Sequence, residues 1–187
     1  DRVAPGQGFG AHPHRDMEIV SIVLEGELEH QDSMGNKTRI RPGEVQRMTA
    51  GTGVVHSEYN PDPMRPVHFL QIWILPSAQG LPPSYAQQAF PEHERQGRLR
   101  RVVSPDGADG SITIHQDASL YLGALAAGER ITHALETGRR AYLQVLSGAI
   151  TLDGQALGAG DGARIEQQAA LVLEGVAPAE ILLFDLP

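Results

Sequence analysis

Residues 6–60 carry the features from which the architecture can be argued, and they read GQGFGAHPHRDMEIVSIVLEGELEHQDSMGNKTRIRPGEVQRMTAGTGVVHSEYN. Two short motifs, His12-Pro13-His14 and His56-Ser57-Glu58, stand near the ends of this segment. In an extended strand, side chains two residues apart point to the same face, with Cα atoms roughly 6.5 Å apart. If the motifs lie on neighbouring strands, three imidazoles and one carboxylate converge. The pattern therefore predicts a metal site made of His12, His14, His56 and Glu58.

Either motif taken alone is equally compatible with a histidine pair in a surface loop. The sequence between the motifs favours the metal site, because it alternates β-type runs with turn signals. Four such signals divide the 41 residues between His14 and His56, namely residues 25–26, 32–36, 41–44 and 51–53. Short strands at this spacing, enclosed by both ligand pairs, predict an antiparallel barrel or jelly roll with the site in its mouth.

These residues resemble a known family. The first cupin motif is matched by Gly6, His12, His14, Glu18 and Gly26, and the second by Gly53, His56 and Asn60. More closely, HPHRDMEIVSIVLEGELEHQDSMGNK (residues 12–37) and GEVQRMTAGTGVVHSEYNP (residues 43–61) resemble the pirin family, in particular its bacterial quercetin 2,3-dioxygenase-like branch. The resemblance extends over essentially the whole chain and implies an all-β protein of cupin barrels.

The resemblance also implies a site and a reaction. In the family, the two histidines of HPH and the His and Glu of HSE hold a metal, and they correspond to His12, His14, His56 and Glu58. The implied activity is oxidation of a flavonol by O₂ at this mononuclear centre. Nitrogen and oxygen donors suit Fe(II), Ni, Zn, Cu or Mn, and we expect Fe(II). Glu58 is the candidate catalytic base for the proton of the flavonol hydroxyl.

The start of the chain departs from the family pattern. The family has an N-terminal segment of some tens of residues before the first motif, whereas this sequence begins at Asp1. We expect that segment to be absent here. An N-terminally truncated form would leave the site more open to water and would be less active than a full-length chain.

The composition is that of an ordinary soluble globular protein, with 41% hydrophobic and 20% charged residues among 187. No run approaches the roughly 20 apolar residues of a membrane span, so we expect a cytoplasmic protein without membrane contact. The absence of cysteine excludes thiolate ligands. A net charge of −8 disfavours direct nucleic-acid binding. We interpret the arginine-rich cluster at residues 93–101 as a solvated face.

Residues 76–98 interrupt the β pattern with proline and glycine and contain no strand-length apolar run. We expect a surface connector there, with one helical turn at residues 85–88. The predicted domains are residues 1–98, a metal-binding cupin barrel with its connector, and residues 99–187, a second cupin barrel.

The second half repeats the first in degenerate form. The run VLEGEL at residues 23–28 has an echo in VLSGAI at 145–150, and Pro-Gly-Glu at 42–44 has one in Ala-Gly-Asp at 159–161. Aligning these glycines sets Ala134 and Glu136 against His12 and His14, and sets Leu173 and Gly175 against His56 and Glu58. The second barrel is therefore predicted to lack metal ligands. Asp153-Gly154 within it predicts a two-residue hairpin.

Three functions stay open from the residues and the resemblance. The first is a metal-dependent dioxygenase that acts on a small aromatic substrate with O₂. The second is a metal-bearing regulatory protein that binds a protein partner, because the resemblance to pirins also implies a co-regulator role. The third is an isomerase or a sugar-binding cupin. Fold cannot separate these functions, since all three use the same barrel.

Overall fold

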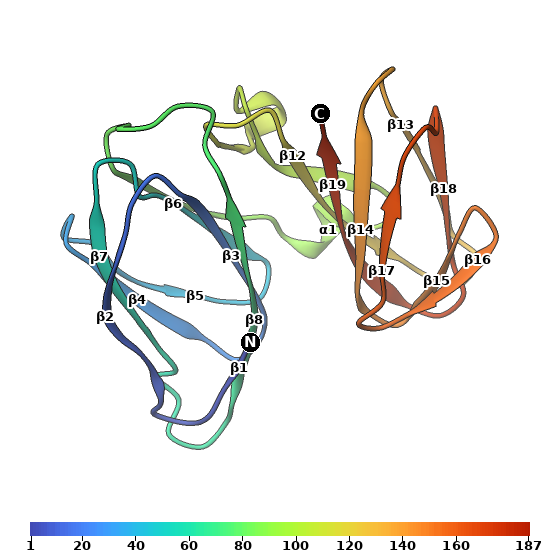
Figure 1. The fold of residues 1–187 in the computed structure, drawn as a ribbon. Helices are drawn as coiled ribbons and strands as arrows, with labels where there is room; N and C mark the ends of the chain where they lie inside the picture. Colours follow the sequence, from blue (N-terminus) through green and yellow to red (C-terminus); the bar gives the residue numbers. More distant parts are fainter. The chain divides into compact units, whose positions relative to one another are not determined.

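The structure, a computed structural model, describes all 187 residues. Its elements are nearly all strands, and they form two compact units (Figure 1). The first unit comprises residues 1–89 and 114–116, and the second comprises residues 90–113 and 117–187. Each unit contains two β-sheets, so the expected all-β fold of two tandem cupin barrels is confirmed. The domain boundary between residues 98 and 99 stays a prediction.

The first unit pairs a five-stranded sheet with a four-stranded sheet. Their strand orders are β1-β8-β3-β6-β9 and β2-β7-β4-β5, and all neighbours are antiparallel. The strands are β1 (Arg2–Val3), β2 (Gly8–His14), β3 (Glu18–Glu25), β4 (Leu28–Asp32), β5 (Lys37–Ile40), β6 (Glu44–Thr49), β7 (Val54–Tyr59), β8 (Val67–Ile74) and β9 (Ser84–Ala89). The β2 and β7 strands therefore lie side by side, as the two histidine motifs require.

Apolar side chains fill the interior of this barrel, and buried and exposed residues alternate along strands such as β7. On β7, His56 and Glu58 are buried while Val55 and Tyr59 are exposed. Strand β3 is buried over most of its length, which explains its nearly continuous apolar sequence. The buried clusters consist of Val3, Val23, Leu28, Ile40, Val67 and Phe69, and of Ile19, Met48 and Val54. The alternation on β7 turns the predicted ligands towards this interior.

The second unit has a six-stranded sheet, β11-β10-β12-β19-β14-β17, and a four-stranded sheet, β13-β18-β15-β16. Its strands are β10 (Leu99–Ser104), β11 (Ile112–Thr113), β12 (Ser119–Leu125), β13 (Arg130–Ala134), β14 (Arg140–Ser147), β15 (Ala149–Leu152), β16 (Gln155–Gly158), β17 (Gly162–Ile165), β18 (Ala170–Gly175) and β19 (Ala179–Leu186). Asp153 and Gly154 both have positive φ, 48° and 83°, between β15 and β16. The predicted two-residue hairpin is thus confirmed.

Gly26 and Gly148 show that the echo in the sequence reflects a structural repeat. Their φ angles are +80° and +73°, a conformation that favours glycine. A Cβ at either position would also clash with backbone, at 2.8 Å from the carbonyl oxygen of Pro66 and closer still to that of Pro178. Each glycine therefore makes the same tight turn between equivalent strands of the two units.

The predicted helical turn at residues 85–88 was wrong. Those residues lie in β9, which pairs with β6 along its length and sets Tyr85 opposite Met48. Strand β6 is buried, and without β9 one row of its backbone groups would lack partners. Pairing with a strand distant in sequence thus outweighs the weak local preference of this segment.

The interpretation of residues 93–101 as a solvated face was wrong in part, since His93 and Arg98 are exposed but Arg95 and Arg100 pack inward. Arg95 is buried and donates from Nη1 to Glu180 Oε1 at 3.1 Å. Arg100 donates from Nε to Glu94 Oε2 at 2.9 Å and lies over the Phe90 ring at 5.1 Å. These arginines therefore stabilise the second unit internally.

Helices contribute little to the fold. They are α1 (Glu92–Arg95) and the 3₁₀ turn η1 (Ala108–Gly110). No helix of the structure has the length and apolar character needed to cross a membrane.

Candidate metal centre

Strands β2 and β7 bring the two histidine motifs together. His12 lies directly opposite His56 in the antiparallel register, and Gly8 lies opposite Tyr59. Gly8 permits this approach, because a Cβ there would overlap the backbone of β7. The register shifts between Phe9 and His12, and such bulges re-aim side chains next to functional sites.

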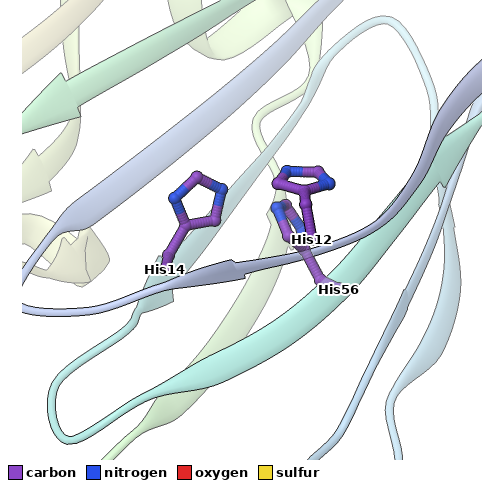
Figure 2. Close-up of side chains that lie close together, drawn as sticks. All are labelled: His12, His14 and His56. Carbon is purple, nitrogen blue, oxygen red and sulfur yellow. The ribbon is translucent and has the colours of Figure 1, made fainter.

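The three histidines form a compact cluster (Figure 2). Their ring centroids are 4.4 Å apart for His12 and His56, and 4.9 Å apart for each of the other two pairs. One potential ligand atom from each ring lies within 4.8 Å of the others. Glu58 does not belong to this triad. It forms a second group of the same size with His56 and His30, so the two groups share His56.

The hydrogen bonds show which nitrogen and oxygen atoms in and beside the cluster are free to bind a metal. His12 Nδ1 donates to the carbonyl oxygen of Gly10 at 2.7 Å, which leaves the lone pair on Nε2. The buried atoms His14 Nε2, His56 Nε2 and Glu58 Oε1 have no hydrogen-bond partner. Leaving a buried polar atom unpaired costs about 1–3 kcal/mol. A divalent transition ion that accepts nitrogen and oxygen donors would satisfy these atoms, so the residues present fit a metal.

The protonation states also suit a cation. Burial lowers the pKa of His56 to about 3, and the His12, His30 and His14 rings add to this shift. Burial lowers the pKa of His14 as well, with a contribution from His12. Both rings are therefore neutral at pH 7, which is the form that binds metals. Burial raises the pKa of Glu58, although its hydrogen bond with Gln71 acts in the opposite direction.

Two residues of β8 support the cluster and were missed in the sequence. Gln71 Nε2 donates to Glu58 Oε2 at 2.6 Å, which holds one carboxylate oxygen and leaves Oε1 free. The Trp73 indole meets the His14 ring edge-on at 5.0 Å and donates from Nε1 to Gln71 Oε1 at 3.4 Å. The only signal in the sequence was one amide in the apolar run HFLQIWIL. Its place in the sheet depends on the pairing of β8 with β3, which sets it opposite Ser21.

His30, on β4, is fully buried beside the cluster. Its Nε2 lies 3.0 Å from Asp32 Oδ2, and its Nδ1 lies 3.4 Å from His56 Nδ1. Strand pairing sets His30 opposite Glu58 and Asp32 opposite His56. Both ring nitrogens of His30 thus already have neighbours, unlike those of His14 and His56.

Three further buried atoms without a partner, Ser21 Oγ, Gln46 Oε1 and Arg47 Nε, lie on the neighbouring strands β3 and β6 of the same barrel. Ser21 and Gln46 face each other between these two strands. Ser21 also lies opposite Gln71, the residue that holds Glu58. The interior next to the histidine cluster is therefore polar and incompletely hydrogen-bonded.

Strand register corrects the alignment of the second barrel. Leu152 follows Gly148 by four residues, as His30 follows Gly26, and Leu152 pairs with Leu173 as His30 pairs with Glu58. Two residues earlier on β18, Leu171 pairs with His133. The positions of His12, His14, His56 and Glu58 are thus taken by His133, Leu135, Leu171 and Leu173. The alignment with Ala134, Glu136, Leu173 and Gly175 was wrong by one and two residues, because connecting loops differ in length.

Comparison with known proteins gives consistent matches along the chain. A family model described as Pirin matches residues 1–74, and one described as the quercetinase C-terminal cupin domain matches residues 101–186. The quercetin 2,3-dioxygenase of Escherichia coli strain K12 is 46% identical over 187 residues, which cover 100% of this chain and 80% of that protein. A pirin-like protein of Caulobacter vibrioides is 40% identical and covers 99% and 80%. The structure of the bacterial pirin YhhW from Escherichia coli in complex with nickel(II) matches with a TM-score of 0.94 and 46% identity, covering 100% of this chain and 79% of that one.

Proposed function

The chain belongs to the pirin family, and from this membership we propose that it is a metal-dependent dioxygenase of the quercetin 2,3-dioxygenase type, which oxidises a flavonol with O₂. The proposed ligands are His12, His14, His56 and Glu58. The observation that carries the proposal is a set of buried atoms without hydrogen-bond partners, His14 Nε2 and His56 Nε2 in the histidine cluster and Glu58 Oε1 in the group that shares His56. We propose Fe(II) as the native metal, with nickel as the first alternative because a nickel complex of a relative is known.

A divalent transition metal bound there would supply a Lewis acid and a redox centre with open positions for ligands. The residues of the chain would provide orientation and proton transfer. The Glu58 carboxylate, of which Oε2 is held by Gln71, would take the proton of the flavonol hydroxyl. A carboxylate within reach of a bound hydroxyl can serve as the general base for its proton.

Trp73 supports an aromatic substrate. Its side chain is 55% exposed although it contacts the edge of the His14 ring. An exposed indole beside the metal ligands offers a flat apolar face on which a flavonol ring can stack. His12 and His14 are themselves only half-buried.

The experiment combines metal analysis with an activity assay. The protein is purified without added metal, its metal content is measured, and quercetin oxidation is followed in air together with O₂ consumption. We expect a single divalent metal ion per chain and turnover that chelation abolishes and metal addition restores. Full metal occupancy without flavonol oxidation, for each of Fe(II), Ni, Mn and Cu, would contradict the proposal.

A second candidate is a metal-bearing regulator that binds a protein partner. It is favoured by Phe9, Val55 and Tyr59, which are 41–46% exposed on the β2 and β7 strands that carry the ligands. Apolar groups on these strands could report metal occupancy to a partner. Metal binding without flavonol oxidation, in the experiment above, is the result that this candidate requires.

A further inference from the structure

We propose that Asp32 and His30 act as positioning residues that set the tautomer of His56, so that its Nε2 is free to bind the metal. The inference rests on the proposed function, because it takes His56 as a metal ligand. It assigns to His30 and Asp32 a role in metal affinity, although neither is among the proposed ligands.

The three side chains form a continuous series of contacts across the neighbouring strands β4 and β7. From His56 Nδ1 the distance to His30 Nδ1 is 3.4 Å, and from His30 Nε2 the distance to Asp32 Oδ2 is 3.0 Å. The side chains of His30 and Asp32 have no exposed surface. Tyr85 packs against the His30 ring at 5.1 Å, and its hydroxyl is held by Thr38. The ring of His30 is therefore fixed between its two neighbours.

The hydrogen-bond donors that surround Asp32 show that its carboxylate acts only as an acceptor. Oδ1 accepts the backbone amides of Met34 and Asn36, at 2.9 Å and 3.0 Å. Oδ2 accepts from Asn36 Nδ2 at 2.8 Å and faces His30 Nε2. An ionised carboxylate accepts and cannot donate. His30 must therefore carry its proton on Nε2.

The proton on His30 Nε2 determines which ring nitrogen of His56 carries its proton. A neutral imidazole with hydrogen on Nε2 has its lone pair on Nδ1, so His30 Nδ1 accepts. His56 must then donate from Nδ1, which leaves the lone pair of its ring on Nε2. His56 Nε2 is the buried atom without a partner. One carboxylate thus selects, through two rings, the metal-binding form of His56.

The same series explains why His30 is a poor candidate for a ligand itself. His30, His56 and Glu58 lie close enough to hold an ion. Both nitrogens of His30 are committed, however, one to Asp32 and one to His56. In the second unit Leu152 occupies the position of His30, and Leu171 occupies that of His56. The positioning residue and the ligand are thus both replaced there by leucine.

The first test is Asp32→Asn, measured by nickel(II) titration of the full chain. An asparagine can still accept the amides of Met34 and Asn36 through its oxygen, but its NH₂ group would face His30 Nε2. His30 would then protonate on Nδ1, and His56 would be driven to the tautomer with hydrogen on Nε2. We expect nickel to bind 10- to 100-fold more weakly, the usual loss for an outer partner of a ligand.

Gly35→Ala is the matched control for damage to the turn. Gly35 lies in the same 32–36 turn with φ +93°, and a Cβ there meets no atom within 4 Å. The substitution strains the turn but changes no polar group of the series. We expect its thermal midpoint to fall while its nickel affinity stays at the wild-type value. An equal loss of nickel affinity in Gly35→Ala and Asp32→Asn would overturn the proposal.

His30→Gln and His30→Leu provide an independent test. Glutamine can accept at one atom and donate at another, as the neutral ring of His30 does, whereas leucine can do neither. We expect nickel affinity to fall 10- to 100-fold in His30→Leu. His30→Gln should retain most of the wild-type affinity. Wild-type affinity in His30→Leu would overturn the proposal.

The tautomer itself is read from the ring ¹⁵N shifts of His56 in the zinc(II)-loaded chain, where binding through Nε2 leaves a protonated Nδ1. Metal bound through Nδ1 of His56 in the wild-type protein would overturn the proposed series. Different results would contradict the proposed metal site and the proposed role of Asp32 and His30. No nickel binding by the wild-type chain contradicts the metal site, whereas wild-type binding together with unchanged affinity in Asp32→Asn contradicts only the role of Asp32 and His30.

Discussion

Corresponding positions of the two barrels carry polar side chains in the first barrel and leucines in the second. Where the first has His14, His56 and Glu58, the second has Leu135, Leu171 and Leu173. These leucines are part of one apolar cluster, so the second interior is closed by packing. In the first barrel the same positions carry buried donors without partners. A similar pair of sheets thus supports an apolar core in one unit and the proposed metal site in the other.

His133 sharpens this contrast, because it is the one histidine retained at a ligand position. Its Nε2 lies 3.3 Å from Asp185 Oδ2, and its ring meets Tyr121 edge-on at 5.0 Å. Arg139 donates to Asp185 and binds Asp117 with two hydrogen bonds of 2.9 Å and 3.1 Å. The polar groups around His133 thus satisfy one another. Residue type alone is therefore a weaker sign of a site than unpaired buried donors.

The largest expected effect is the loss of metal from a ligand variant. His56→Ala removes one of four proposed donors, and its metal affinity should fall by more than the roughly 100-fold typical of an outer partner. His133→Ala, at the place of the second barrel that corresponds to His12, should keep the wild-type metal content. Metal analysis and nickel titration of both variants measure this difference. Unchanged metal content in His56→Ala would remove that residue from the site.

The next effect separates metal binding from proton transfer within the first barrel. Glu58→Gln keeps a neutral oxygen near the metal but removes the base, so metal should remain at reduced affinity. Flavonol turnover at equal metal loading should fall about 10²- to 10⁴-fold, the usual contribution of a general base. Steady-state rates with measured metal content decide the matter. Full turnover with metal retained would exclude Glu58 as the base.

Metal removal should distinguish the two barrels in stability. A ligand that binds only the folded state adds about 3–4 kcal/mol at 100 to 1,000 times its dissociation constant. Chelation should therefore accelerate hydrogen exchange in residues 1–75 and leave residues 117–187 nearly unchanged. Equal acceleration in both regions would show that metal binding does not act on the first barrel alone.

The smallest effect concerns pH and the paired network of the second barrel. Burial alone would raise the pKa of Asp185, but hydrogen bonds from His133 and Arg139 outweigh it and lower the pKa below 3.8. A lowered folded-state pKa stabilises the protein above the unfolded value, and this stabilisation disappears as pH falls through the folded value. Asp185→Asn should therefore lose about 1.5–3 kcal/mol at pH 7 and show a flatter acid dependence.

This pH prediction is measured by hydrogen exchange of the second unit at pH 7 and at pH 3. Arg164 and Glu166 form an exposed ion pair in the same unit, so Glu166→Gln is a suitable control with little expected loss. A wild-type stability in Asp185→Asn at pH 7 would show that the network contributes nothing net.

Much of the fold and of the candidate site follows from local patterns in the sequence. Strand alternation alone was enough to propose that His12 and His14, and likewise His56 and Glu58, each share a face. The Asp153-Gly154 hairpin was equally readable, because its positive φ angles depend on two adjacent residues. The resemblance of the histidine motifs to the pirin family added the fold, which the structural match confirms.

Tertiary structure decided what depends on register and on partners distant in sequence. The distance from Gly160 to Leu171 is shorter by two residues than that from Gly43 to His56, so aligning glycines misplaced the second set of positions. Gln71 and His30 lie beside the cluster only because β8 pairs with β3, and β4 with β7. Residues 84–89 became a strand because β6 offered an unpaired edge. Side-chain direction within a strand is a local property, whereas its neighbour across the sheet is set by the closure of the whole barrel.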